Sequence, residues 1–327
     1  MPRLVRGRHA GSAMHPDEAT AMRDDPLASW LKQQLGVELQ RRTALSGGSI
    51  HHAWRLELAG GELLFAKGGE RQSLPLLEAE ADGLAALAAA AEGSGLHVPA
   101  PLALGGHDTL ALLVLPWLPL RSGGAAGDWQ ALGRSLARLH RGSLKRACAA
   151  GDRGGSHHGW IRDNVIGATP QANGWLEDWG RFFTERRLAP QLERLARRGI
   201  QLQGAEALLE QVPAWLACHR PAAVLVHGDL WCGNASLLAG GGGALFDPAV
   251  HRGDREVDLA MAHLFGGFPP EFFRGYEQDW PLPEGHHQRQ SLYNLYHLLN
   301  HANLFGGGYR SQAQACLTSL LATPPVA

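Results

Sequence analysis

The hydrophobic pattern of this chain changes near Pro116, and that change limits the folds open to it. The upstream part combines short apolar runs and glycine-rich turns with two helical patterns, which predicts helices at 26–35 and 74–91 and strands at 40–45, 53–58, 62–67 and 109–115. The downstream part predicts two short strands at 224–226 and 244–246 among helices at 129–141, 175–198, 205–218, 258–265 and 288–305. This order predicts an α+β fold in which a small, antiparallel, β-rich lobe precedes a larger helical lobe.

The same order divides the chain into segments. We expect an N-terminal tail at 1–25, a β-rich lobe at 26–115, a hinge at 116–118, a helical lobe at 119–321 and a C-terminal tail at 322–327. A cleft between two such lobes is the expected ligand site, because concave sites form preferentially at domain interfaces.

Composition excludes several classes of protein. Hydrophobic residues make up 45% of the 327 residues, enough for a large core, and 30 basic against 31 acidic residues give a formal net charge of -1. This balance creates no general field that would attract nucleic acid or an anionic membrane, so we expect neither partner. The four cysteines form no C-x-x-C pair and no stretch is apolar enough to span a membrane, which favours a soluble protein in a reducing, cytoplasmic compartment.

The most specific motif reads HGDLWCGN over residues 227–234 and is followed by DP at 247–248. Asp229 and Asn234 lie on a loop that leaves one predicted strand, and Asp247 follows the next. Phosphoryl transfer needs these residue types, because a carboxylate accepts the hydroxyl proton while an amide oxygen and a second carboxylate hold the Mg²⁺ that bridges the nucleotide phosphates. The spacing matches H-R-D-x-x-x-x-N and D-F-G of kinases, with glycine replacing the arginine and proline the phenylalanine. A polar turn with a capping aspartate is the alternative.

A lysine and a glutamate upstream fit the same chemistry. Lys67 ends the predicted strand at 62–67, and Glu80 lies in the predicted helix that follows. An ion pair between them would orient the ammonium toward the α and β phosphates of a nucleotide, whereas an unpaired lysine would be only a solvated strand end. Glu78 is the competing partner, and we favour Glu80.

Two further segments are candidates for nucleotide contacts. The turn Gly47-Gly48-Ser49 joins two predicted strands, and its glycines would let backbone N–H groups approach a phosphate, although such a turn is also common in plain hairpins. At the hinge, the backbone of Leu115 and Trp117 would supply the acceptor and the donor for the adenine edge, since Pro116 has no N–H group.

Several segments together resemble the fructosamine kinase (ketosamine-3-kinase) family, a branch of the protein-kinase-like phosphotransferases that includes aminoglycoside and choline kinases. The resemblance covers roughly residues 27–320, and its Trp-rich and Phe-Gly-Gly segments are more particular to the family than its kinase core. The segments are GGSI (47–50), FAK (65–67), EADGL (80–84), HGW (158–160), DNVIG (163–167), TPQ (169–171), WLEDW (175–179), RRL (186–188), HGDLWCGN (227–234), DPA (247–249), GDREVDLAM (253–261), LFGGF (264–268) and LNHANLFGG (299–307).

The resemblance implies a bilobal, protein-kinase-like fold and an ATP- and Mg²⁺-dependent kinase. Its substrate would be a ketosamine, such as a fructosamine or ribulosamine, phosphorylated on the sugar 3-hydroxyl as a deglycation step. The resemblance also implies Asp229 as the catalytic base, Asn234 and Asp247 as Mg²⁺ ligands, and Lys67 with Glu80 at the nucleotide phosphates. An aminoglycoside or choline kinase of the same fold is one alternative, and a pseudokinase is another, which the intact set of five residues argues against.

On the substrate side we expect an aromatic platform and several hydrogen-bonding groups, because a sugar presents hydroxyls and a weakly apolar C–H face. Trp231, two residues after the expected base, is the candidate platform, and His301 and Arg187 are candidates for substrate contacts. Core packing is the alternative for the tryptophan and the histidine. We expect His227 and Asp258 to support the catalytic loop, with Asp258 also capping a helix.

Overall fold

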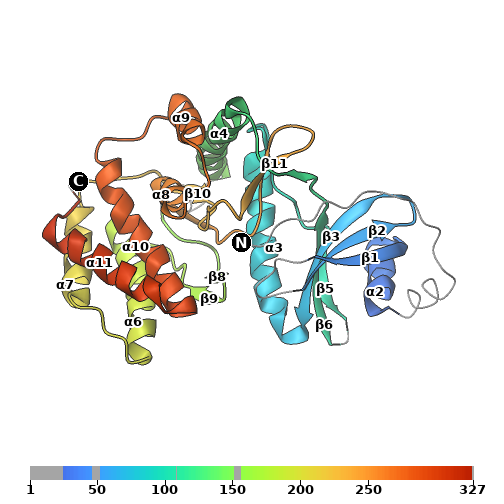
Figure 1. Cartoon of the computed structure of the whole chain (residues 1–327), viewed down its shortest axis with the longest axis horizontal. Helices are drawn as coiled ribbons and strands as arrows, with labels where there is room; N and C mark the ends of the chain where they lie inside the picture. The colour runs from blue at the N-terminus through green and yellow to red at the C-terminus, as the bar shows by residue number, and fades with distance from the viewer. Residues whose placement is uncertain (1–24, 46–51, 108, 151–155, 326–327) are drawn as a thin grey trace.

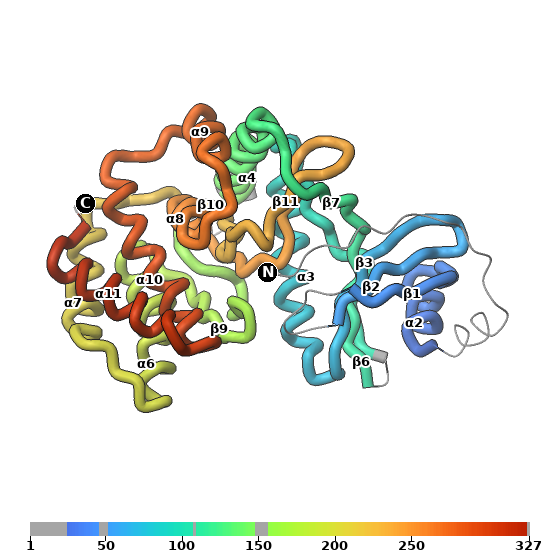
Figure 2. The backbone as a smooth tube through the Cα atoms, viewed as in Figure 1, coloured from blue at the N-terminus to red at the C-terminus, as the bar shows by residue number. Residues whose placement is uncertain are grey.

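An antiparallel sheet forms one end of the molecule and helices form the other (Figure 1). The computed structural model describes residues 25–45, 52–107, 109–150 and 156–325, and Figure 2 traces the chain through them. The order of sheet first and helices second confirms the predicted α+β class. No helix within these ranges has the length and apolarity needed to cross a membrane.

Five strands form the N-terminal sheet in the order β1-β2-β3-β6-β5, with antiparallel neighbours throughout. Their bounds are β1 Leu39–Leu45, β2 His52–Leu58, β3 Leu63–Glu70, β5 Ala103–His107 and β6 Leu110–Pro116. Helix α2 (Pro26–Leu35) packs on one face and helix α3 (Leu74–Ala91) on the other (Figure 1). Val114 of β6 joins the cluster with α2, whereas Leu113 joins the cluster with α3. Burial on both faces explains the uninterrupted apolar run that predicted this strand.

The C-terminal part is mainly helical. Its described helices are α4 Ala126–Ala150, α5 Trp179–Phe183, a π-helical turn Thr184–Leu188, α6 Ala189–Arg197, α7 Ala205–Trp215, α8 Glu256–Leu264, α9 Pro270–Asp279, α10 His286–Phe305 and α11 Gly308–Ala322. One buried cluster around Trp179 joins α5, α6, α7, α8, α10 and α11. A second, around Phe272, joins α4, α8, α9 and the end of α3. Helices α8 and α10 are therefore firmly packed supports for the loops beside them.

Short paired strands position the segments that lead to the site. The pairs are β8 Asn164–Ile166 with β9 Thr169–Gln171, β10 Val224–Val226 with β13 His251–Gly253, and β11 Ala235–Leu238 with β12 Gly243–Leu245, the last pair being flanked by β4 Leu96–His97 and β7 Leu120–Arg121. The HGDLWCGN motif therefore begins directly after β10 and ends directly before β11. Asp247 follows β12 by two residues, so the strand ends bring the motif and this aspartate together.

The predicted helices at 26–35 and 74–91 have the observed bounds, but the single helix predicted at 175–198 was wrong. Helix α5 begins only after Asp178, which is extended and caps it by accepting a hydrogen bond from the Arg181 N–H at 2.8 Å. The π-helical turn then separates α5 from α6. The strands that were not predicted are β4, β5, β7, β8, β9, β11 and β13, and most of them are too short to show a period. Helices α9 and α11 were not predicted either.

Candidate active site

A cavity of about 380 Å³ lies where β3 and α3 face the C-terminal part of the chain. The opposite wall comes from the HGDLWCGN loop, the β8–β9 hairpin and α10. Seven of the residues expected at the active site line it, namely Lys67, Glu80, Asp229, Trp231, Asn234, Asp247 and His301. Residues separated by more than two hundred positions in the sequence thus share one site.

A buried aspartate on α8 holds the backbone of the catalytic loop. Asp258 accepts hydrogen bonds from the backbone N–H groups of His227 at 2.7 Å and Gly228 at 2.8 Å. Nε2 of His140, on α4, lies 3.1 Å from the same carboxylate. His227 donates from Nε2 to the Phe246 carbonyl at 3.0 Å, which ties the loop to the segment after β12. The loop is therefore held at its start from two sides.

The expectation that Asp258 caps a helix was wrong. Helix α8 begins two residues earlier, and Asp254 instead accepts a hydrogen bond from the Glu256 N–H at 3.0 Å. Burial opposes ionisation of Asp258, but the hydrogen bond and charge of His140 and the Gly228 N–H lower its pKa overall. The carboxylate is ionised, so the nearby His140 nitrogen must carry the proton of their hydrogen bond.

Glycine is required at position 228 by a close backbone approach. A Cβ there would lie 2.0 Å from the carbonyl oxygen of Ala249, and φ is +81°. No side chain fits so near a backbone atom, and L-residues rarely adopt this φ. The arginine of the kinase motif is therefore excluded from this loop by packing.

Asn234 connects the two acidic residues of the site. Its Nδ2 donates to the Asp229 carbonyl at 2.9 Å, to the Asp229 Oδ2 at 3.1 Å and to the Asp247 carbonyl at 3.3 Å. Its Oδ1 has no hydrogen-bond partner among the described residues. Asp247 has a positive φ of 56°, and its side chain is 46% exposed. The Asn234 amide oxygen and the partly exposed Asp247 carboxylate are of the oxygen type that Mg²⁺ prefers as ligands, so these residues fit that ion.

The environment of Asp229 suits proton transfer. Burial raises the pKa of Asp229 to about 7, the hydrogen bond from Asn234 opposes the rise, and the charge of Asp247 adds to it. A base with such a pKa accepts a proton effectively near neutral pH. Asp229 also lines the cavity, where a substrate hydroxyl would meet it.

Lys67 joins the two walls of the cavity. Its Nζ donates to Glu80 at 2.8 Å and also contacts the carboxylate of Asp247. Burial opposes the charge of this lysine, but the two carboxylates raise its pKa overall, so the ammonium stays protonated. The structure also decides between the two candidate partners, because Glu80 makes the ion pair while Glu78 lines a different groove on the outer side of α3.

Two of the three expected substrate residues lie in the cavity. Trp231 is 39% exposed, unlike Trp179, which is 2% exposed and packs in the core. His301 lies on α10 and donates from Nδ1 to the His297 carbonyl at 2.9 Å. Burial lowers the pKa of His301, so the ring is neutral and its Nε2 is left as an acceptor.

The expectation that Arg187 contacts the substrate was wrong. This side chain is 1% exposed, and its guanidinium donates to the carbonyls of Ala172 at 2.5 Å and Arg186 at 3.0 Å and to the Asn173 side chain at 2.6 Å. It also lies 4.7 Å from the ring centre of Phe182. Arg187 therefore stabilises the core, where both of its terminal nitrogens donate to protein groups and its Nε is buried.

The glycine turn and the hinge are the remaining segments expected to contact the nucleotide. The turn Gly47-Gly48-Ser49 lies outside the described residues. Leu115 is buried near the end of β6, where it pairs with Phe65, and Trp117 follows with the Arg55 guanidinium 5.8 Å from its ring centre. Neither Leu115 nor Trp117 is among the described residues that line the cavity, and their hinge contacts stay a prediction.

Sequence reasoning missed a buried polar network beneath the cavity. Asn164 donates to the Val250 carbonyl at 2.8 Å, and Gln171 donates to the Ala249 carbonyl at 3.1 Å and to Asn164 Oδ1 at 2.8 Å. Tyr296 of α10 donates to Gln171 Oε1 at 2.7 Å. The network fixes the backbone that leads from the site to β13. The segments DNVIG and TPQ around a glycine signal a hairpin, but nothing in them identifies these distant partners.

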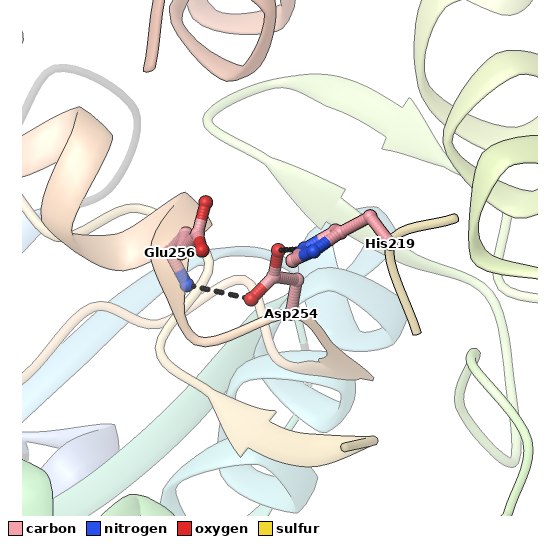
Figure 3. A group of neighbouring side chains, drawn as sticks. All are labelled: His219, Asp254 and Glu256. Atoms are coloured by element: carbon pink, nitrogen blue, oxygen red, sulfur yellow. Dashed lines mark hydrogen bonds and ion pairs between the residues drawn. The ribbon is translucent and has the colours of Figure 1, made fainter. Parts of the chain in front are cut away.

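A second cluster of ionisable side chains, His219, Asp254 and Glu256, brings ligand-type atoms within 4.8 Å of one another (Figure 3). Asp254 Oδ2 is engaged by His219 at 2.6 Å and by the Tyr293 hydroxyl at 2.7 Å, and its Oδ1 accepts the Glu256 N–H. The Glu256 carboxylate makes two bonds with the Arg289 guanidinium, at 2.8 and 2.9 Å. Because these oxygens are already paired, the cluster joins α8 to α10 as a structural network and does not form an open cation site.

The fold and the site together define a protein-kinase-like phosphotransferase. The same fold occurs in an amicoumacin kinase solved in complex with AMP-PNP, Ca²⁺ and Ami, with a TM-score of 0.56 and 15% identity, covering 95% of this chain and 98% of that one. A member of this fold class thus binds an ATP analogue together with a divalent ion.

The chain belongs to the fructosamine kinase family, whose family model matches residues 24–323. It is 40% identical over 297 residues to a probable ketoamine kinase of Synechocystis sp., covering 90% of this chain and 96% of that one. It is 34% identical over 307 residues to a chloroplastic protein-ribulosamine 3-kinase of Oryza sativa subsp. indica, covering 92% and 85%. The crystal structure of a putative fructosamine-3-kinase from Haemophilus somnus matches with a TM-score of 0.79 and 27% identity over 90% and 96% of the two chains. The protein is therefore an ATP-dependent phosphotransferase of this family, as predicted.

Proposed function

We propose that this protein uses ATP and Mg²⁺ to phosphorylate the sugar 3-hydroxyl of ketosamines. The observation that supports the reaction class is the convergence of Lys67, Asp229, Asn234 and Asp247 on one cavity. The ketoamine and ribulosamine kinases among the relatives support the substrate class. Trp231 and His301 suit a sugar, because the first offers an aromatic platform and the second an acceptor for a sugar hydroxyl.

In the proposed reaction, Asp229 accepts the proton of the sugar hydroxyl as that oxygen bonds to the γ-phosphorus of ATP. The bond from this phosphorus to the β,γ-bridging oxygen breaks, and ADP leaves with its electrons. Proton transfer contributes roughly 10²- to 10⁴-fold to the rate. Lys67, held by Glu80, orients and neutralises the phosphates, and this positioning supplies most of the remaining acceleration.

Asn234 Oδ1 and the Asp247 carboxylate would hold the Mg²⁺ ion. When bound, this ion neutralises charge on the nucleotide phosphates. We further infer that residues 26–115 and 119–321 act as the nucleotide-binding and catalytic lobes around the hinge at 116–118. The turn at 47–49 would contact the phosphates from the first of these lobes.

A substrate panel tests the proposal. The full chain is assayed with ATP and Mg²⁺ against fructosyl and ribulosyl adducts of simple amines, choline and an aminoglycoside, with ADP release as the readout and NMR to locate the phosphate. We expect turnover of a ketosamine with phosphate on the 3-oxygen. Turnover of choline or the aminoglycoside alone would reject the substrate class, and phosphate on another oxygen would reject the position.

Asp229→Asn tests the base. We expect at least a ~10²-fold loss of turnover with ATP binding nearly intact, because the amide keeps the shape but accepts no proton. Asp128→Asn is the matched control, since Asp128 is a surface residue outside the described cavity lining. Equal turnover of the two variants would reject the role of Asp229.

A further inference from the structure

We propose, on the basis of the function above, that the outer half of the cavity selects ketosamines whose amine carries an uncharged, apolar group. Phe305 and Leu304 of α10 would form the contact surface for this group. The sugar would lie deeper, beside Asp229 and Trp231. The amine substituent would then determine which adducts are turned over fastest.

Helix α10 runs from the interior of the cavity to its mouth. Asn300 is 2% exposed, His301 and Leu304 are half-buried, and Phe305 is 65% exposed, and all four line the cavity. Five residues along a helix correspond to about 7.5 Å, which is longer than the distance between any two carbon atoms of one sugar ring. A sugar at the level of His301 therefore places its amine substituent at the level of Leu304 and Phe305.

Other elements contribute further apolar side chains to the cavity. Leu76 and Ala79 of α3 and Val165 of β8 line the same cavity. The turn of the hairpin lies close to α10, since a Cβ on Gly167 would be 3.3 Å from Leu304 Cδ1. An exposed phenylalanine at the rim of such walls offers apolar area that a ligand would remove from water.

The charged side chains of the cavity already have partners. Among the described lining residues, the charged side chains are Lys67, Glu80, Asp229 and Asp247. Lys67 contacts Glu80 and Asp247, and Asp229 is bonded to Asn234. Each carboxylate of the described lining is thus already engaged, and none is left to pair with a second ammonium on the ligand. A second ammonium placed against Leu304 and the other apolar side chains would lose hydration without compensation, which disfavours polyamines and aminoglycosides.

A matched pair of substrates tests this selection. With the sugar that the panel identifies, the adduct of n-pentylamine is compared with the mono-adduct of 1,4-diaminobutane, which replaces a terminal methyl with an ammonium. We expect kcat/KM to favour the pentyl adduct by about 10-fold, through KM. Phe305→Ala should reduce this ratio to below about 3-fold, whereas Ile161→Ala, an exposed apolar residue outside the described lining, should keep it.

A second variant introduces a negative charge at the same position, so its effect is distinguished from that of lost packing alone. Phe305→Asp should invert the preference toward the diaminobutane adduct, because it supplies the missing carboxylate. Equal kcat/KM for the two adducts, or a ratio unchanged in both Phe305 variants, would overturn the selection while leaving the kinase activity established. Turnover of neither adduct would instead reject the proposed function and this selection with it.

Discussion

Because Asp258 holds the backbone of the catalytic loop, we predict that Asp258→Asn loses both stability and turnover. Asp258 is fully buried, and its two oxygens accept the N–H groups of His227 and Gly228 and a hydrogen bond from His140. In either orientation of the new amide, an NH₂ group faces a backbone N–H that has lost its acceptor. An unsatisfied buried donor costs about 1 to 3 kcal/mol, and hydrogen bonds to a charged acceptor are worth about 1.5 to 3 kcal/mol each. We expect a net loss of about 3 kcal/mol, a large part of the 5 to 15 kcal/mol typical of a domain.

The displaced loop should also slow the reaction. A shift of about 1 Å at reacting groups costs up to 10²-fold, so we expect at least a ~10-fold fall in kcat under conditions where the variant is folded. Urea unfolding followed by tryptophan fluorescence measures stability, and ADP release measures kcat. Asp128→Asn is the control, because Asp128 also accepts from a backbone N–H and an arginine but at the surface, and its unfolding midpoint should stay near that of the wild type. Wild-type stability and wild-type kcat in Asp258→Asn would refute the claim that Asp258 holds the catalytic loop.

Gly228→Ala should lower the free energy of unfolding by more than about 2 kcal/mol, because its Cβ would lie 2.0 Å from the Ala249 oxygen, whereas Gly240→Ala meets no atom within 4 Å. Equal melting temperatures for these two variants would contradict the close approach. Burial lowers the pKa of His158 from 6.5 to about 4, so the unfolded state binds the proton first and stability falls as the pH drops from 6.5 toward 4, by about 2 kcal/mol at pH 5. His158→Gln should flatten this part of the curve, and an unflattened curve would count against the assignment. Asn234→Ala should raise the Mg²⁺ concentration for half-maximal turnover at least ~10-fold, and an unchanged Mg²⁺ titration would rule out its role as a ligand.

Features whose signal lies within one stretch of sequence could be predicted. The helix at 74–91 has strong helix formers and a helical apolar period, and its observed bounds match. The five-residue spacing of Asp229 and Asn234 fits a single loop, and the structure brings both to the cavity with Asp247. Lys67 and Glu80 belong to consecutive elements, so their pairing follows from one strand-to-helix connection.

Features that depend on distant partners could not be predicted. Nothing near His140 indicates that it meets Asp258 across 118 positions, and nothing near Gln171 indicates the Ala249 carbonyl. The expectation that Arg187 contacts the substrate was wrong for the same reason. Arginine is mostly exposed in proteins, and only the fold reveals that two backbone carbonyls and the Asn173 side chain take up this guanidinium.

Different interactions form the catalytic part of the cavity and its outer half, and this difference bears on how the substrate preference of such an enzyme can change. The part around Asp229 depends on hydrogen bonds with backbone groups, which Asp258 accepts and Asn234 donates, and such bonds tolerate few substitutions. The outer half depends on the side chains of Leu304 and Phe305 at the end of one helix, where exposure leaves room for change. A new amine preference therefore requires substitutions at the rim only, while the phosphoryl-transfer chemistry stays intact, which is how one fold serves kinases of different small molecules.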